Sequence, residues 1–265
     1  MYIYFIFRLL VLKLFIFCAL FISCFGWTNT QCATTYKVGV GTLWPPYVMY
    51  DDTSYSGLDV EISEAVFLHA GFCIEFVKLP SSARGIVELQ KGEIDVLPSA
   101  SYNKERAEIA HFSKGYRRER MRLFTHQVTT PITNLTELFA AEYTFTANPG
   151  AYYGEELAQI LTIKWYKQRF FEVASVTQRM ELVKRGRVDF LIEDEISGLY
   201  FKRLLGYKNI VLHEYVVNDN AIHFMLNRQS FDYDKVRKIN NAIKAINPEL
   251  RRIEAKYTEW IKGNP

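Results

Sequence analysis

The segment KGEIDVLPSASYNKER, residues 91–106, places Arg106 in the first turn of an expected helix that follows a buried strand. A cation at a helix start opposes the positive end of the helix dipole, at a cost of about 0.3–1 kcal/mol. The guanidinium fork can bind a carboxylate through two parallel charge-assisted hydrogen bonds, and the free N–H groups of a helix start also attract anions. Arg106 is therefore either a solvated surface arginine or half of a carboxylate site.

Other residues with suitable chemistry lie near turns and strand ends. Ser101 either caps the same helix or presents its hydroxyl to a ligand. Three acids in the segment IEDE, residues 192–195, stand at a strand end, where they are either solvated or turned toward a cleft. Trp44 and Tyr47 flank two prolines, and they either pack against them or form the wall of a pocket.

Neither catalysis nor a cofactor is indicated by the residue types. The 4 Cys and 5 His have no metal-ligand spacing, and no nucleophile–base pair is recognisable. The net charge is +3 with no long basic run, so nucleic acid is not an expected partner. We therefore expect a protein that binds no metal and no cofactor and that is not an enzyme.

Strand and helix patterns alternate along the chain. Strands over 36–42, 73–79 and 93–99 are separated by helices over 58–71 and 83–92, an order that predicts parallel strands with right-handed crossovers. The same order returns after residue 142. The segments ELQKGEIDVL and ELVKRGRVDFL repeat one design, a helix end, a glycine and a strand with an aspartate, which suggests two similar lobes unless the likeness is chance.

Two further strands connect the expected lobes. The segment 120–130 looks like a strand that leaves the first lobe, and 220–229 like a strand that returns to it, separate from another strand over 209–215. We therefore expect residues 34–124 plus 221–265 as lobe 1 and residues 125–220 as lobe 2. Helices on both sides of Pro248 end the chain, and the cleft between the lobes is the expected ligand site.

The first 26 residues are apolar apart from Arg8 and Lys13. A basic flank, a short apolar core and small residues predict a secretory signal peptide, with a membrane anchor as the alternative. The segment FISC weakly resembles a lipoprotein cleavage box, which would place a lipid anchor on Cys24. Cys32 and Cys73 would then remain in an oxidising compartment, and they can form a disulfide if their strands are neighbours.

The chain resembles the bacterial extracellular solute-binding proteins of family 3, which serve polar amino-acid ABC transporters. The resemblance runs from about residue 36 to 261 and is carried by WPPYVMYDD, SGLDVEISEAVF, LQKGEIDVLPSASYNKERAEIAHFS, VKRGRVDFLIED and AKYTEWI. It implies the periplasmic binding protein type II fold, in which two α/β lobes joined by a two-strand hinge close over a small solute. It also implies a periplasmic monomer that delivers the solute to an ABC permease in the inner membrane.

The resemblance also implies a ligand site. Ser101 and Arg106 occupy the positions that bind an α-carboxylate, although Lys104 replaces the family's proline. Ser99 takes the position whose backbone carbonyl receives the ligand ammonium, and Asp194 takes that of the acid that pairs with the ammonium. We therefore expect a carboxylate-bearing solute, and an amino acid in particular.

Departures from the family pattern bear on the identity of the ligand. The family's Gly-Ser-Thr is Gly-Ala-Tyr here, so one carboxylate-binding hydroxyl is either missing or replaced by the phenol of Tyr152. Gly41 replaces an acid that relatives use for cationic side chains, which argues against lysine or arginine as the ligand. Trp44 and Tyr47 are the expected aromatic wall, and Arg84 would be an extra cleft cation that favours an acidic ligand.

Two other functions fit the same resemblance. One is a periplasmic enzyme like cyclohexadienyl dehydratase, with Glu193 or Glu195 as its acid. The other is a ligand-sensing binding protein without a transporter. Because the chain ends soon after its last expected helix, we expect a stand-alone binding protein.

Overall fold

The computed structural model describes residue 32 and residues 34–126 and 132–262. The chain divides into two units, Met1–Ala33 and Thr34–Pro265, and the second unit carries the fold. The predicted leader, residues 1–26 with Cys24, lies outside the described residues. Among the helices within the described ranges, none is both long and apolar enough to cross a membrane.

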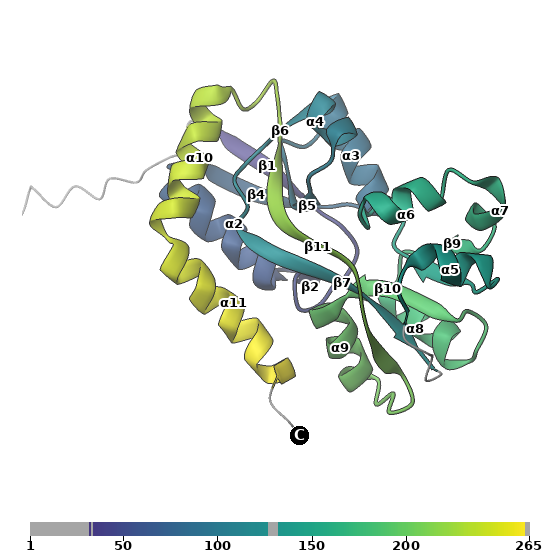
Figure 1. Cartoon of the computed structure of the whole chain (residues 1–265). Coiled ribbons are helices and arrows are strands. Elements are labelled where there is room, and N and C mark those ends of the chain that lie inside the picture. Colours follow the sequence, from purple (N-terminus) through teal and green to yellow (C-terminus); the bar gives the residue numbers. More distant parts are fainter. Residues whose placement is uncertain (1–31, 33, 127–131, 263–265) are drawn as a thin grey trace, which may run out of the picture. The chain divides into compact units, whose positions relative to one another are not determined.

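A single mixed sheet runs through the second unit in the order β4-β1-β5-β11-β7-β10-β8-β9, with β6 also paired to β11 (Figure 1). The strands are β1 Thr35–Val40, β4 Cys73–Lys78, β5 Val96–Ser101, β6 Ala110–Phe112, β7 Arg117–Thr125, β8 Phe145–Ala147, β9 Phe170–Glu172, β10 Phe190–Asp194 and β11 Val211–Asn227. A separate two-stranded sheet joins β2 Met49–Tyr50 to β3 Tyr55–Ser56.

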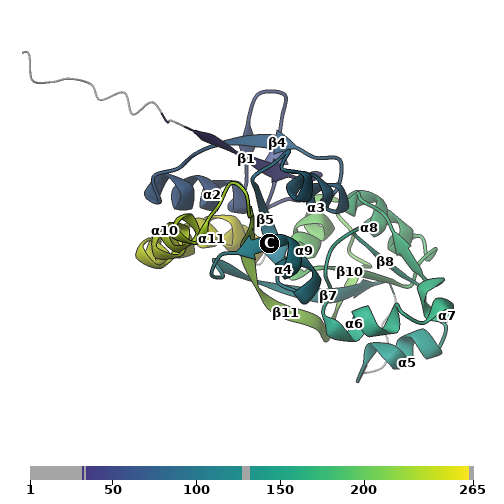
Figure 2. The same ribbon diagram turned by 90° about the horizontal axis from the view of Figure 1, so that it is seen from above.

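The fold is two α/β lobes joined by the strands β7 and β11. The first lobe holds β1, β4, β5 and β6, and the second holds β8, β9 and β10 (Figure 1 and Figure 2). The first lobe carries the helices α2 Leu58–His69, α3 Ser82–Lys91, α4 Lys104–Ile109, α10 Tyr233–Ala245 and α11 Asn247–Lys262. The second carries α5 Leu135–Ala140, α6 Glu155–Ile160, α7 Lys164–Lys167, α8 Val176–Lys184 and α9 Glu195–Leu204. The residue limits that we predicted for the lobes stay predictions.

The expected parallel pairing within each lobe is confirmed. β1 pairs in parallel with β4 and β5, and β8 does so with β10 and β9. The repeated aspartates end up in equivalent structural roles: Asp95 accepts the backbone N–H of Lys37 at 2.8 Å, and Asp189 accepts that of Thr144 at 2.8 Å. Each aspartate thus joins two neighbouring strands of its own lobe.

The returning strand differs from the prediction. β11 is one strand of 17 residues, where we expected separate strands over 209–215 and 220–229. It pairs with β7 over much of its length, with register shifts between Leu212 and Val216 and between Val216 and Asn218. These irregularities let the polar residues between the two apolar segments stay within a continuous ladder. The first joining strand begins at Arg117, earlier than predicted, and the end predicted at residue 130 lies outside the described residues.

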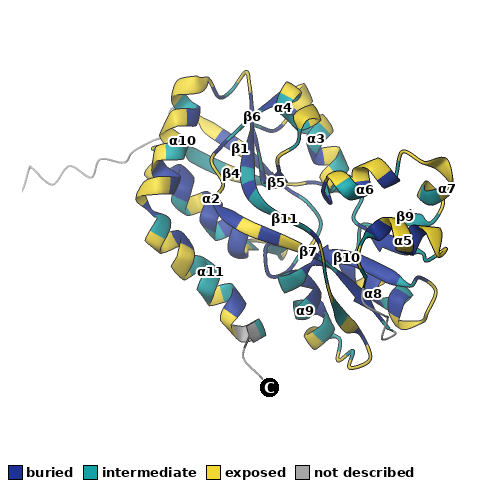
Figure 3. Ribbon diagram, in the orientation of Figure 1, coloured by how far each residue is buried: buried dark blue, intermediate teal, exposed yellow. Residues whose placement is uncertain are grey.

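Apolar side chains form separate cores in the two lobes, and the strands of the sheet are mostly buried (Figure 3). Phe67 meets Phe224 edge-on with ring centroids 5.3 Å apart in the first lobe. In the second lobe Phe145 stacks on Phe139 at 4.1 Å and on Phe190 at 5.5 Å. Aromatic pairs of this kind add about 0.5–1.5 kcal/mol beyond the area they bury, so each lobe has its own apolar support.

Cys32 and Cys73 are both disulfide-bonded in the structure. Cys73 opens β4, where it pairs with Thr35 of β1. The predicted disulfide requires β1 and β4 to be neighbours, and they are. The pairing of Cys32 with Cys73 stays a prediction.

Candidate functional site

A cavity of about 120 Å³ lies among residues of both lobes. One water needs about 10–15 Å³ on this scale, so the cavity is large enough for a small solute. Five of the eight predicted site residues line it: Trp44, Ser99, Ser101, Arg106 and Tyr152. The other three, Tyr47, Arg84 and Asp194, do not.

Arg106 reaches the cavity from the start of α4. Its guanidinium donates from Nη1 to the carbonyl oxygen of Ser101 at 3.0 Å and from Nη2 to that of Gly150 at 2.7 Å. Its backbone N–H donates to the Asn103 side chain at 2.8 Å, so this N–H is not open to an anion. Burial lowers the pKa of the guanidinium, and the field of Glu119 opposes that shift. Arginine stays charged and has five N–H donors, so donors remain for a carboxylate in the cavity.

Two serines of β5 line the cavity beside Arg106. Ser101 donates its hydroxyl to Oε2 of Glu119 at 3.4 Å. Ser99 has a φ of 59°, an uncommon value for a residue other than glycine. Its backbone N–H donates to the hydroxyl of Tyr116 at 2.8 Å, and its own hydroxyl bonds to Asp59. These hydrogen bonds hold both serines in place beside the cavity. The ligand contacts that we predicted for the two serines stay predictions.

Glu193 is the acid of the IEDE segment that lines the cavity. Its Oε1 accepts the indole N–H of Trp44 at 2.8 Å and the backbone N–H of Asp194 at 3.2 Å. Its Oε2 is ion-paired with Arg179, a residue only 1% exposed, which also donates to the carbonyl of Ala174 at 2.9 Å. Both oxygens of Glu193 are therefore engaged by the protein.

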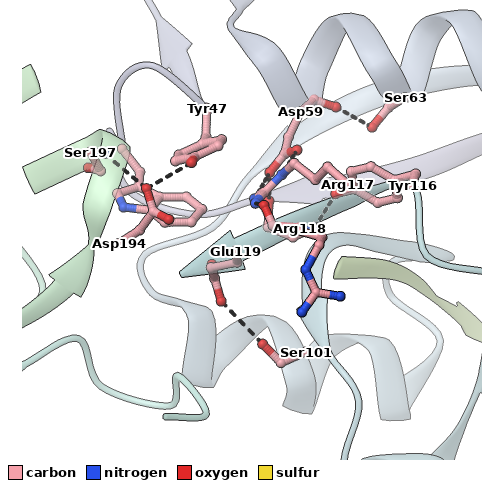
Figure 4. Close-up of polar contacts among 12 residues, drawn as sticks. Tyr47, Asp59, Ser63, Ser101, Tyr116, Arg117, Arg118, Glu119, Asp194 and Ser197 are labelled. Atoms are coloured by element: carbon pink, nitrogen blue, oxygen red, sulfur yellow. Dashed lines mark hydrogen bonds and ion pairs between the residues drawn. The ribbon is translucent and has the colours of Figure 1, made fainter. Parts of the chain in front are cut away.

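Asp194 does not line the cavity, and its carboxylate contacts the phenol of Tyr47 (Figure 4). Its Oδ1 accepts the phenol of Tyr47 at 2.8 Å and the backbone N–H of Ser197 at 2.9 Å, so it caps α9. Burial raises the pKa of this carboxyl to about 6, and the charge of Arg117 acts against that rise. In this structure both predicted residues support the wall from outside the cavity.

Arg84 and Tyr152 have different surroundings. Arg84 lies on α3 with 52% of its side chain exposed, and it pairs with Glu88 at 2.6 Å. The structure therefore does not bring this predicted cation into the cavity. Tyr152 lines the cavity two residues after Gly150, and burial raises the pKa of its phenol.

Sequence reasoning missed Glu119, a cavity residue on β7 that is 3% exposed. Burial raises the pKa of this carboxyl to about 8. Next to it, Arg117 forms a bidentate ion pair with Asp59, with both contacts at 2.7 Å (Figure 4). The segment RRERMR contained the signal, since alternate strand residues share a face, and Arg117, Glu119 and Met121 are the buried ones.

A two-lobed α/β fold with a small cavity between the lobes defines the class of periplasmic binding protein type II domains. Residues 36–260 match the family described as bacterial extracellular solute-binding proteins, family 3. The chain belongs to that family, as the resemblance of its motifs predicted.

Sensors and amino-acid-binding proteins are among the similar proteins. The virulence sensor protein BvgS of Bordetella bronchiseptica is 22% identical over 166 residues, which are 62% of this chain and 13% of BvgS. The sensor domain of a histidine kinase has a TM-score of 0.73 at 18% identity, with 84% of this chain and 95% of that chain covered. The arginine-, lysine-, histidine-binding protein ArtJ of Geobacillus stearothermophilus has a TM-score of 0.70 at 17% identity, with 88% and 97% covered. At such identities the solved structures show the fold alone.

Proposed function

We propose that the chain binds a small carboxylate-bearing solute, an amino acid, in the cavity between its lobes. The observation that carries this proposal is Arg106, a guanidinium that lines the cavity and uses two donors on carbonyl oxygens. The remaining donors suit the two oxygens of a carboxylate. Ser101, on the same wall, offers a hydroxyl near the same place.

The composition of the cavity supports an amino acid over a dicarboxylic acid. Arg84, which would have favoured an acidic ligand, lies outside the cavity and pairs with Glu88. Arg179 lines the cavity but is paired with Glu193. Among the described residues that line the cavity, Arg106 is then the cation available for one carboxylate, and Trp44 gives the wall an aromatic surface.

The proposed physiological role is uptake. In this proposal the leader of residues 1–26 exports the chain to the periplasm, where it acts as a monomer and delivers its solute to an ABC permease. The family match supports the binding of a solute outside the cytoplasm. The chain binds without turning its ligand over. Sustained conversion of arogenate or prephenate would contradict this role in favour of a dehydratase.

Ligand sensing without a transporter is the second candidate. It is favoured by the similarity to BvgS and to a histidine kinase sensor domain. Both candidates use the same cavity and the same solute. Uptake of the labelled solute by cells with and without the gene separates them, because only the transport role requires a loss of uptake.

A thermal-shift screen of the exported chain tests the binding proposal. The ligands are the common amino acids and a set of small organic acids, each at millimolar concentration. A ligand at 100 times its Kd stabilises by about 2.7 kcal/mol, which for a chain of this size raises the Tm by roughly 5–10 °C. If none of these solutes raises the Tm, the proposal is wrong.

A further inference from the structure

We infer that Glu119 binds the ammonium group of the solute and that the cavity selects solutes whose only charges are one carboxylate and one ammonium. This inference rests on the proposed function and extends it. It assigns the ammonium to a residue of the joining strand β7 in place of Asp194, to which the family resemblance had assigned it.

The surroundings of Glu119 leave its carboxylate available. The side chain is 3% exposed and lines the cavity. Among the described residues its carboxylate accepts one hydrogen bond, from the Ser101 hydroxyl at 3.4 Å. That distance exceeds the usual 2.5–3.0 Å or so for an O–H···O hydrogen bond. A buried carboxylate with one weak partner has a large capacity left for a donor in the cavity.

The other candidate acids have no such capacity. Glu193 uses both oxygens on Trp44, Asp194 and Arg179. Asp194 caps α9 and does not line the cavity. An ammonium in this cavity can therefore bind Glu119 while breaking fewer existing hydrogen bonds and ion pairs than it would at Glu193 or Asp194.

Charge accounting limits the rest of the solute. Within the part of the chain that the structure describes, four charged residues line the cavity: Arg106, Glu119, Arg179 and Glu193. Arg179 and Glu193 neutralise each other in a buried pair. Arg106 and Glu119 then match one carboxylate and one ammonium, and a third charge on the solute would be buried without a partner, which is strongly unfavourable. An amino acid with an uncharged side chain meets this condition.

Glu119 stands in a field of several charges. Arg117 on its own strand favours ionisation, and Asp194 and Glu193 of β10 and Asp59 of α2 oppose it. Arg106 of α4 also interacts electrostatically with Glu119. The phenols of Tyr47 and Tyr153 do so too. Burial has the largest effect and raises the pKa of the carboxyl to about 8. At neutral pH, and before a solute binds, the Glu119 side chain is therefore mostly protonated.

Binding should then release a proton. An ammonium beside Glu119 stabilises the carboxylate, so the O–H bond of the acid breaks, the proton goes to solvent, and the carboxylate pairs with the ammonium. The solute keeps its own protons throughout. Proton release is a signature of Glu119 that an uncharged hydrogen-bond partner would not give.

Isothermal titration calorimetry of the exported chain tests the inference. The probes are L-alanine, L-serine and L-glutamine, with propionate as the counterpart of alanine that lacks an ammonium. Titrations at pH 6.5 in phosphate and in imidazole, which both buffer at this pH and differ in ionisation enthalpy, give the number of protons released. The variants are Glu119→Gln and, as a control, Glu108→Gln, an exposed acid of α4 outside the cavity lining.

We expect up to one proton released per amino acid bound in the wild type and in Glu108→Gln, and none in Glu119→Gln. Loss of one partner of a buried charge pair should weaken amino-acid binding roughly 30-fold or more, while any binding of propionate stays unchanged. Amino-acid binding with unchanged affinity in Glu119→Gln, or binding without proton release, overturns this inference and leaves the proposed function standing. Failure of the three amino acids to bind the wild type also overturns the inference, and the thermal-shift screen then decides separately whether the proposed function stands.

A stability measurement guards against a folding defect in the variant. The raised pKa means that the folded state holds the proton of Glu119 more tightly than the unfolded state does. Its contribution to stability is thus present at low pH and is lost as the pH rises from about 4.5 to 8. The free energy of unfolding is measured by urea titration over this pH range. Glu119→Gln should fold normally and lose this part of the pH dependence. A variant that fails to fold would show no unfolding transition in urea.

Discussion

Arg117 and Asp59 form the most deeply buried ion pair near the site, with both side chains 0% exposed. Arg117 also lies over the ring of Tyr47, 4.1 Å from its centroid. Tyr47 in turn donates to Asp194. The pair therefore connects α2 and β7 of the protein to the residues that support the cavity wall.

Replacing Asp59 should be costly because it leaves a buried guanidinium without its partner. Loss of one member of a buried pair typically costs about 3–5 kcal/mol, so Asp59→Ala should lower the free energy of unfolding by that amount in urea titrations. Asp219→Ala, which removes the exposed partner of Arg118, is the matched control and should cost at most about 1 kcal/mol. Equal losses in the two variants would contradict the role assigned to Asp59.

The position of a candidate site residue beside the cavity was predictable from sequence where a local rule governs it. Arg106 was singled out because a cation is unexpected near a helix start, and the structure places it in the cavity lining. Which of Glu193 and Asp194 lines the cavity depends on the direction in which β10 presents alternate side chains, and that direction is set by pairing with β7. Glu119 was missed because acids are rarely buried, and its burial follows from the position of β7 between the lobes.

At the scale of elements, close packing of α9 on β7 fixes the end of β10 that carries the site. Gly198 of α9 faces the ring of Phe124, and a Cβ on this glycine would lie 2.0 Å from the nearest ring atom. Phe124 itself is 0% exposed. The helix can approach the strand this closely only because residue 198 has no side chain.

Gly198→Ala should therefore destabilise the protein by overpacking. Extra volume in a tightly packed interior costs about 1–3 kcal/mol, which outweighs the gain in helix propensity of about 1 kcal/mol. Thermal unfolding followed by circular dichroism would show the change. Leu204→Ala on the same helix, at a residue 59% exposed, is the control and should have little effect. A more stable Gly198→Ala would show that the helix moves away freely.

Most helices and strands were predictable because their ends carry explicit signals. Gly92 ends α3 in the left-handed conformation that the sequence predicted, with φ at 80°. Pro248 stands in the first turn of α11, where proline is well tolerated. β11 was not predictable as one strand, since its continuity across polar residues comes from pairing with β7, a contact between segments about a hundred residues apart.

At the scale of the whole second unit, the lobes touch around the cavity. Arg106 donates to the carbonyl of Gly150, and the amide of Asn148 donates to the hydroxyl of Ser82 at 3.1 Å. A Cβ on Gly150 would lie 2.6 Å from the Cα of Ala83. These contacts join the two lobes beside the cavity, and we propose that β7 and β11 flex as a hinge when the lobes move apart.

Calorimetric titration of Arg106→Ala with the amino acid that most raises the Tm of the wild type tests the central claim most directly. Arg84→Ala is the control, since it removes a cation of the same lobe that lies outside the cavity. Removal of a charge-assisted bidentate partner should abolish measurable binding in Arg106→Ala, a loss of about 2–5 kcal/mol, and leave Arg84→Ala like the wild type. Wild-type affinity in Arg106→Ala would contradict the account.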